Sequence, residues 1–466
     1  MSALQPTRRD VLVAAAASPL LTTLACETQR ATPSKPVARP RHVIVFVADD
    51  NSRIDLGCYG NRDCHTPNID ALAAQGMRFR CGYTPVGICK PARAALYTGL
   101  YPTKNGATGF TPIRADVATW TELLTPDVCA TGMIGKLNVE PLEKFRFEKW
   151  ERPREVGGAR DTAELAAAFG GMLDTFRERR MALVVNLKDP HRPFRAPYDT
   201  PECQPTPVPH DPTKLSVPPS LYDTPATRKE LALYYDAIWR LDCSVGRLLA
   251  ELDARGLRDD TLVLLTSDNG QPFPFAKTTL YECGINLPFI ARWPRALAAG
   301  GVSDALVSLI DILPTALDAF EIDAAGTLDG RSLLPLLRGE TRGVRDAIVG
   351  QHTAGRVGAP TPSRSLRTAR FKYIRNFSPE NEFDSNIVEH SETWSSWEQA
   401  AANDPALAAR MHALLWRAAE ELYDLESDPY ELKNLAADPA HARELADMRA
   451  RLAEWMRVNG DPLYTG

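Results

Sequence analysis

The chain has 466 residues, of which 44% are hydrophobic, a formal net charge of −5 at pH 7 and a pI near 6.0. This length is sufficient for one large domain with an appendage around an extensive core. The mildly acidic balance excludes a global electrostatic attraction to nucleic acid, so an anionic substrate requires a local basic pocket.

The N-terminal residues are typical of an export signal. Thr7-Arg8-Arg9-Asp10 precedes an apolar run from Val11 to Ala25, which is too short to span a bilayer. The run resembles a twin-arginine signal, and Leu24-Ala25-Cys26 resembles a lipobox that makes its cysteine the lipidated first residue of the mature protein. We therefore expect a signal over residues 1–26, a tether over residues 27–40, and a periplasmic or cell-surface lipoprotein that meets the membrane only through a lipid on Cys26. A plain disordered leader is the alternative.

The next part of the chain alternates between apolar runs and helical patterns. Its first run, His42 to Ala48, is typical of a strand that is buried on both faces. Further strands are predicted at residues 131–135, 181–187 and 261–266, and helices at residues 66–73, 161–177 and 229–252. The alternation predicts an α/β domain over residues 41–360, in which helices cover both faces of a mostly parallel sheet.

Two of the predicted strands end in oxygen-bearing side chains. Asp49 and Asp50 follow the first strand, and Asp268 and Asn269 follow the strand over residues 261–266. Open α/β sheets bind ligands at the carboxyl ends of their strands, and adjacent carboxylates repel unless a cation lies between them. The four side chains together predict an all-oxygen site for calcium or magnesium. A solvated turn is the alternative for the first pair.

A short stretch, Cys89-Lys90-Pro91-Ala92-Arg93, opens a helical run that ends near Gly99. The spacing predicts Cys89 at a helix N-terminus, where free N–H groups favour anions. Arg93, one turn later, adds a planar cation. On spacing alone, a small buried hydrophobe is the favoured interpretation of Cys89, and a thiolate nucleophile of lowered pKa comes next.

Three further polar residues follow predicted strands or their loops: Lys136, His191 and Lys277. Each taken singly is typical of a surface lysine or a hydrogen-bonded core histidine, and their shared position past strand ends makes them site candidates. The nine cysteines include no Cys-x-x-Cys pair. Setting aside Cys26 and Cys89 leaves an odd number, which disfavours a disulfide framework and a zinc site.

The C-terminal part changes character. Short antiparallel strands are predicted at residues 363–368, 371–375 and 422–425, and a helix at residues 438–458 carries one apolar stripe typical of a core. We therefore expect a smaller α+β subdomain over residues 361–466. Trp394 and Trp397 lie in a polar stretch that we expect to be a loop, where ordinary packing is favoured over a role in a sugar cleft.

Most of the chain, from residue 41 to about residue 462, resembles the formylglycine-dependent sulfatases of the alkaline phosphatase superfamily. The Cys89 stretch matches the signature C-x-P-S-R except for Ala92. Asp268-Asn269-Gly270 and Glu421-Leu422-Tyr423-Asp424-Leu425 support the resemblance. Within the family the chain is most similar to sulfamidases, which cleave N-sulfate from glucosamine in heparan-type glycans.

The resemblance implies an alkaline phosphatase-like fold and an enzyme acting on a sulfated glycan or a small sulfate ester. A formylglycine-generating enzyme would oxidise Cys89, and the hydrated aldehyde would attack sulfur and then expel sulfate. His191 would protonate the leaving group. The implied ligands of Ca²⁺, with Mg²⁺ as the alternative ion, are Asp49, Asp50, Asp268, Asn269 and modified Cys89. The implied contacts of the sulfuryl group are Arg93, Lys136, His191 and Lys277.

One position departs from the family pattern. Sulfatases usually have Gly-Lys-x-His after the second strand, and that histidine is the base expected to release sulfate, whereas this chain has Asn138 there. An amide cannot accept that proton near neutral pH. Two other functions therefore stay open: a phosphodiesterase or phosphonate hydrolase on the same scaffold, and a catalytically degenerate glycan-binding lipoprotein.

Overall fold

The computed structural model describes residues 38–152, 160–194, 209–324, 326–353, 359–383 and 391–465. The expected signal, the lipid anchor at Cys26 and most of the tether lie outside these residues. The chain from Arg39 onward forms one compact unit. No helix in these described ranges is both long and apolar enough to cross a bilayer.

The larger sheet has nine strands, in the order β4-β3-β5-β1-β6-β8-β2-β7, with β9 paired to β2. Their bounds are β1 His42–Ala48, β2 Met77–Tyr83, β3 Ala130–Gly135, β4 Lys149–Glu151, β5 Met181–Asn186, β6 Thr261–Ser267, β7 Asn286–Leu287, β8 Phe289–Arg292 and β9 Gly301–Ser308. β1 is parallel to both of its neighbours, β5 and β6. β8 is antiparallel to β6 and to β2, so the sheet is mixed but mostly parallel.

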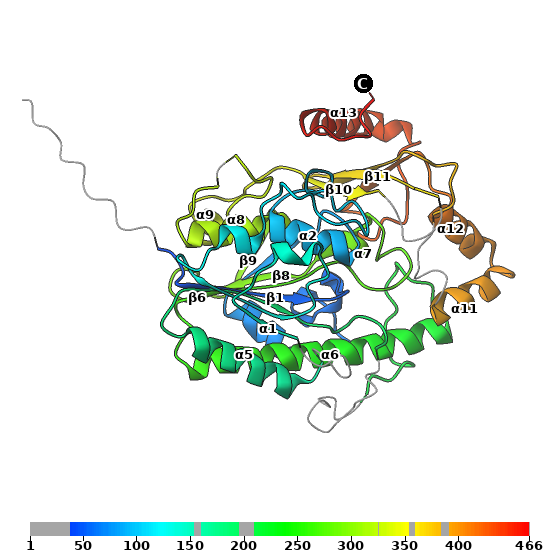
Figure 1. Cartoon of the computed structure of the whole chain (residues 1–466). Helices are drawn as coiled ribbons and strands as arrows, with labels where there is room; N and C mark the ends of the chain where they lie inside the picture. Colours follow the sequence, from blue (N-terminus) through cyan, green and yellow to red (C-terminus); the bar gives the residue numbers. More distant parts are fainter. Residues whose placement is uncertain are drawn as a thin grey trace, which may run out of the picture. The chain divides into compact units, whose positions relative to one another are not determined.

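Helices cover both faces of this sheet (Figure 1). One face carries α1 Pro67–Ala74, α5 Thr162–Phe176 and α6 Pro225–Ala254; the other carries α2 Cys89–Thr98, α8 Ile312–Ala319 and α9 Leu334–Leu337. Short helices are α3 Pro102–Asn105, α4 Trp120–Leu123 and α7 Glu282–Ile285.

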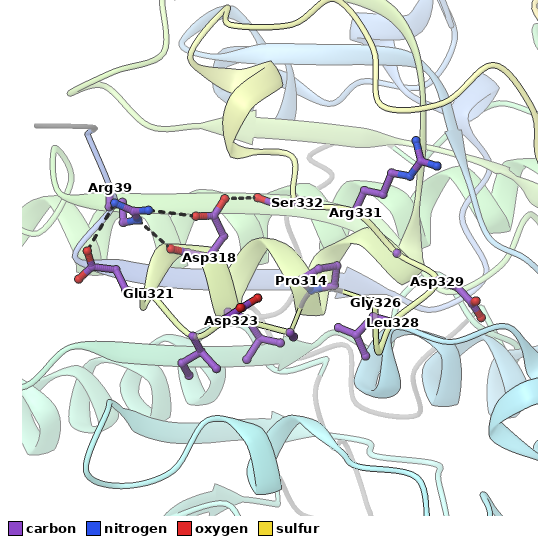
Figure 2. A pocket seen from close by; sticks show the side chains of 14 residues that line it. Arg39, Pro314, Asp318, Glu321, Asp323, Gly326, Leu328, Asp329, Arg331 and Ser332 are labelled. Atoms are coloured by element: carbon purple, nitrogen blue, oxygen red, sulfur yellow. Dashed lines mark hydrogen bonds and ion pairs between the residues drawn. The ribbon is translucent and has the colours of Figure 1, made fainter. Parts of the chain in front are cut away.

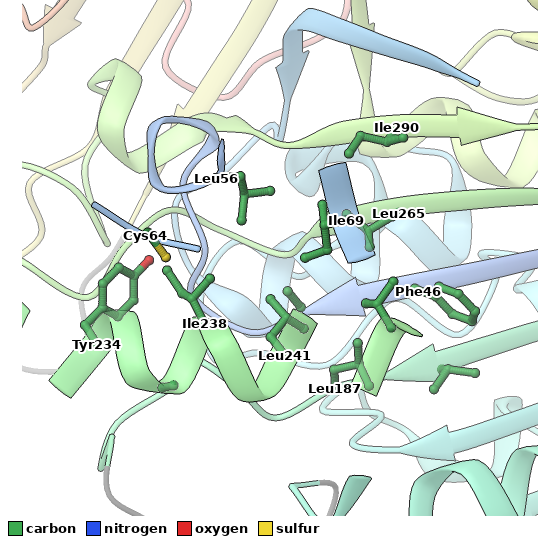
Figure 3. Close-up of a cluster of buried hydrophobic side chains, with 14 of the residues drawn as sticks. Phe46, Leu56, Cys64, Ile69, Leu187, Tyr234, Ile238, Leu241, Leu265 and Ile290 are labelled. Atoms are coloured by element: carbon green, nitrogen blue, oxygen red, sulfur yellow. The ribbon is translucent and has the colours of Figure 1, made fainter. Parts of the chain in front are cut away.

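The sequence of β1 explains this two-sided burial. Ile44 and Phe46 pack in the cluster that includes α5 and α6, whereas Val43 and Val45 pack in the cluster that includes α2 and α8. Figure 3 shows Phe46 in the first of these clusters, together with Leu241 and other residues of α6. Every residue of β1 is buried, as expected for a central parallel strand.

A second sheet of four antiparallel strands has the order β10-β11-β12-β13. Its bounds are β10 Ile348–His352, β11 Ser363–Arg367, β12 Phe371–Asn376 and β13 Glu420–Asp424, with helices α11 Glu392–Ala401, α12 Pro405–Leu415 and α13 Ala442–Val458. β10 precedes the subdomain boundary expected at residue 360. The stripe of α13 packs into the core through Leu445, Met448, Leu452 and Met456.

The predicted fold class is confirmed, and the local errors have simple causes. Trp394 and Trp397 lie in helix α11 and not in a loop, and both are buried in the core. Strands β2 and β9 were not predicted, because charged or polar residues interrupt their apolar pattern. Cys58 and Cys64, the two cysteines closest in sequence, are both free, in line with the expectation of no disulfide framework.

Candidate active site

The register of β1 and β6 brings two pairs of acidic and amide side chains together. Ala48 pairs with Ser267, so the residues that follow the two strands leave the sheet at the same edge. Asp50 N donates to Asp268 Oδ1 at 3.2 Å, and Asn269 Nδ2 donates to Asp50 Oδ1 at 2.8 Å. Asp49, Asp50, Asp268 and Asn269 are each at most 1% exposed. The predicted convergence is therefore present.

Strained backbone accompanies this edge. Asp50, Asn138 and Thr278 have φ values of 72°, 55° and 74°, in the left-handed region that non-glycine residues rarely adopt. Tyr234 holds the first of them, because its hydroxyl donates to Asp50 O at 3.0 Å. Conformations of this kind persist where the surrounding structure fixes them, and they are common at functional sites.

Three buried oxygens at this edge fit a hard cation. Asp49 Oδ1, Asp50 Oδ2 and Asn269 Oδ1 have no hydrogen-bond partner among the described residues. An unpaired buried carboxylate oxygen is costly, and carboxylate and amide oxygens are the ligands that calcium and magnesium prefer. Ligand atoms of Asp49, Asp50 and His191 also lie within 4.8 Å of one another, so His191 borders the same space.

Asp268 differs from the other candidate ligands because both of its oxygens accept hydrogen bonds. Oδ1 accepts from Asp50 N and Asn269 N, and Oδ2 accepts from Arg93 Nε at 2.8 Å. Burial and the charge of Asp49 raise the pKa of Asp268 to about 6. The carboxylate of Asp268 thus connects the backbone of Asp50 and Asn269 to the guanidinium of Arg93.

Three cations face the three carboxylates. Lys136 Nζ lies 2.7 Å from Asp49 Oδ2, Lys277 Nζ lies 2.5 Å from Asp50 Oδ1, and Arg93 pairs with Asp268. Burial opposes the ionisation of Asp49, but Lys136 and Arg93 outweigh it and hold the pKa of Asp49 well below its usual range. Burial likewise opposes the charge on Lys277, but Asp50 outweighs it and raises the pKa of this lysine. A divalent ion added to these balanced charges would make the site attractive to anions.

Cys89 is the first residue of α2, as predicted, and it is partly buried. Asn138 Nδ2 lies 3.3 Å from its sulfur. Burial raises the pKa of the Cys89 thiol, although Lys136 and Lys277 oppose this effect. The unmodified side chain is therefore a neutral thiol near neutral pH, which argues against the thiolate nucleophile that helix position alone permitted.

Arg93 is fully buried and is held from two sides. Its Nη1 donates to Asn186 Oδ1 at 2.6 Å and to Lys136 O at 3.2 Å. Nη2 lies 3.6 Å from Asp49 Oδ2. Sequence reasoning missed Asn186; the available signal was a single amide at the end of the apolar run that forms β5.

His191 lies in a loop that follows β5 and is one-third exposed at its side chain. Its Nδ1 lies 2.6 Å from Arg192 O, and a carbonyl only accepts, so Nδ1 carries the proton. Nε2 then faces the site, 3.9 Å from Asp50 Oδ2. The buried carboxylate of Asp189 anchors this loop by ion pairs with Arg160 and Arg240. The structure thus brings His191 to the other predicted residues.

A separate cavity of about 700 Å³ lies elsewhere (Figure 2). It is lined by residues that include Arg39, Asp318 and Ser332 and by none of the predicted site residues. Its lining residue Gly330 donates its N–H to Gly99 O, just beyond the C-terminal end of α2, whereas Cys89 begins that helix. The cavity is therefore remote from the predicted site.

Comparisons with known proteins identify the family of the chain. A model of the sulfatase family matches residues 41–322, and a model of the C-terminal part of N-sulphoglucosamine sulphohydrolase matches residues 271–391. The human N-sulphoglucosamine sulphohydrolase is 33% identical, with 91% of each chain covered. An ulvan-active sulfatase of Formosa agariphila is 29% identical over 92% of this chain and 82% of the relative.

Solved structures with the same fold include a protein that acts on a sulfated glucosamine and a phosphonate monoester hydrolase. A protein solved in complex with its substrate D-glucosamine-2-N,6-O-disulfate has a TM-score of 0.70 at 20% identity, with 92% of this chain and 100% of that chain covered. The phosphonate monoester hydrolase of Agrobacterium radiobacter has a TM-score of 0.69 at 21% identity, with 90% and 96% covered. These neighbours confirm the expected alkaline phosphatase-like fold. Because the family model spans more than half of the chain and the human relative is 33% identical over nearly all of it, the chain belongs to the sulfatase family.

Proposed function

We propose that the protein hydrolyses sulfamates or sulfate esters on glucosamine-containing glycans. The observation that carries the proposal is the arrangement of Cys89 at one sheet edge with three buried carboxylates and the three cations that pair with them, of which Arg93 is fully buried. The 33% identity to a sulphoglucosamine sulphohydrolase supports the N-sulfated substrate class.

The site's own residues have distinct proposed roles. Arg93, Lys136 and Lys277 neutralise the sulfuryl oxygens, which gain charge as the bond to the leaving group breaks. His191 has its Nδ1 proton fixed by Arg192 O, so Nε2 is the atom that binds and delivers a proton to the departing nitrogen or oxygen. Burial of Arg93 and of the carboxylates of Asp49 and Asp268 strengthens the electrostatic interactions among them.

Two groups complete the proposed site. Ca²⁺, or Mg²⁺, would be held by Asp49, Asp50, Asp268 and Asn269, together with residue 89, and three unpaired oxygens among these side chains support that assignment. Formylglycine, made from Cys89 by a formylglycine-generating enzyme, would supply with the ion a nucleophile that is activated near neutral pH. The match of Cys89, Pro91 and Arg93 to the modification signature supports this assignment.

The proposal includes the cellular location of the protein. The twin arginines and Cys26 support export followed by anchoring through a lipid, which would place the enzyme in the periplasm or on the cell surface. Mass spectrometry of the mature N-terminus from the natural host tests this, because a lipid-modified Cys26 is expected as the first residue. An N-terminus that retains the twin arginines would contradict it.

A panel of substrates tests the proposed activity. We expect release of sulfate from N-sulfoglucosamine or 6-O-sulfated glucosamine to exceed hydrolysis of a phenyl phosphonate and of a phosphodiester. Faster hydrolysis of the phosphonate or the phosphodiester would instead indicate a phosphonate hydrolase or phosphodiesterase. Mass spectrometry of the peptide that contains Cys89 accompanies the panel, and an unmodified thiol with no turnover would favour the glycan-binding alternative.

A further inference from the structure

Asn186 is a buried amide whose two ends are both engaged. It lies at the end of β5 and is 1% exposed. Its Oδ1 accepts from Arg93 Nη1 at 2.6 Å, and its Nδ2 donates to the Tyr97 hydroxyl at 3.0 Å. A guanidinium has only donors, so the oxygen of the amide must face Arg93. Since both partners belong to α2, one strand residue connects two successive turns of the helix that carries Cys89.

The contacts of Arg93 leave one edge of its guanidinium available. Nε is directed at Asp268, and Nη1 is shared between Asn186 Oδ1 and Lys136 O. Nη2 has no hydrogen-bond partner in the described part of the chain, and it is buried. It lies 3.6 Å from Asp49 Oδ2, beside the proposed cation site. Nη2 is therefore the donor that remains for an incoming oxyanion.

The chemistry of Asn186 suits this arrangement better than a carboxylate would. Arg93 already pairs with Asp268, and the site balances three carboxylates against three cations. A neutral amide fixes the direction of Nη1 without adding a negative charge. An aspartate of the same shape would hold the guanidinium equally well but would weaken its attraction for an anion.

We propose that Asn186 is a positioning residue for sulfuryl binding: it aims Nη2 of Arg93 at the substrate anion and, as a neutral amide, adds no further negative charge beside the guanidinium. The proposal rests on the proposed sulfatase function. A purely structural link between β5 and α2 makes a different prediction, because it requires the hydrogen bonds and is indifferent to the charge of residue 186.

Binding of inorganic sulfate, measured by calorimetry on the full-length protein purified with its metal, separates the two roles. Asn186→Asp keeps the acceptor for Arg93 and can accept a hydrogen bond from the Tyr97 hydroxyl in place of donating one, so its thermal midpoint should stay close to that of the wild type while its affinity for sulfate falls about tenfold. Asn186→Leu should lose at least as much affinity and should also lower kcat. Tyr97→Phe is the matched control, because it removes the other partner of Asn186 and should stay within about threefold of the wild type.

Each outcome decides the matter. Wild-type affinity for sulfate in Asn186→Asp would overturn the proposal, as would a loss in Tyr97→Phe equal to that in Asn186→Leu. If Asn186→Leu fails to fold, the aspartate variant alone decides. If the wild-type protein binds sulfate but hydrolyses no sulfate ester or sulfamate, only the proposed function is overturned. If it does not bind sulfate at all, the positioning role of Asn186 is overturned as well.

Discussion

The amide nitrogen of Asn138 lies 3.3 Å from the sulfur of Cys89. Asn138 occupies the position where the sulfatase pattern has a histidine. The contact therefore puts this position next to Cys89, the residue proposed to become the nucleophile. The left-handed backbone of Asn138, with φ of 55°, is one that asparagine and histidine tolerate better than most residues. The position therefore accepts either side chain without a change of backbone.

We predict that Asn138→His raises the turnover of a sulfate ester, by up to about 100-fold, because it restores a base for the release of sulfate. Asn138→Ala, which supplies no base, is the control and should not raise turnover. Steady-state and single-turnover kinetics on the two variants provide the measurement. An unchanged rate in Asn138→His would remove this residue from the explanation of turnover.

We predict that removal of divalent metal lowers both activity and thermal stability, since three buried oxygens would lose their partner. An ion that binds only the folded state stabilises it by about 2.7 kcal/mol at a concentration 100 times its Kd. Thermal unfolding with a chelator, and then with calcium or magnesium restored, measures the effect.

Two variants localise that effect to the proposed site. Asp49→Asn should abolish the stabilisation by added calcium, whereas Asp304→Asn, which alters an exposed ion pair, should retain it. A calcium effect that persists in Asp49→Asn would place the ion elsewhere.

We predict an acid-dependent loss of stability from His352. Burial, with the charges of Arg417 and Arg364, lowers the pKa of His352 to about 3. The unfolded chain binds this proton near pH 6.5, so stability is full above that pH and falls as the pH drops toward 3. At pH 5 this effect lowers the free energy of unfolding by about 2 kcal/mol relative to neutral pH.

Unfolding in denaturant between pH 4 and pH 7 tests the role of His352. His352→Gln should show a shallower pH dependence than the wild type, whereas His412→Gln, at an exposed histidine, should follow the wild-type curve. Parallel curves for the wild type and His352→Gln would mean that this ring does not control acid stability.

We predict that Asp461→Ala costs about 3–5 kcal/mol, because it leaves a buried guanidinium without its counterion. Arg364 and Asp461 are both fully buried and join through Nε–Oδ2 and Nη2–Oδ1 contacts of 2.6 and 3.1 Å. The double variant Arg364→Met/Asp461→Leu should lose much less. Chemical denaturation compares the two, and equal losses would indicate that packing, not charge, dominates here.

The sequence was most informative where polar or charged residues directly follow an apolar run that forms a strand. Asp49 and Asp268 could be predicted to converge because parallel strands bring their carboxyl ends to one edge. Asn186 could not, because its role depends on its contact with α2, which no local pattern encodes. The arginine pairs around Asp189 were missed for the same reason: their partners come from distant parts of the chain.

The direction of β1 has a practical consequence. Its first residue, His42, lies close to Arg39, and its carboxyl end leads into Asp49 about 23 Å away, since a strand of seven residues rises about 3.3 Å at each. A purification tag that replaces the residues ahead of Arg39 would therefore be attached at the edge of the sheet opposite the reactive groups.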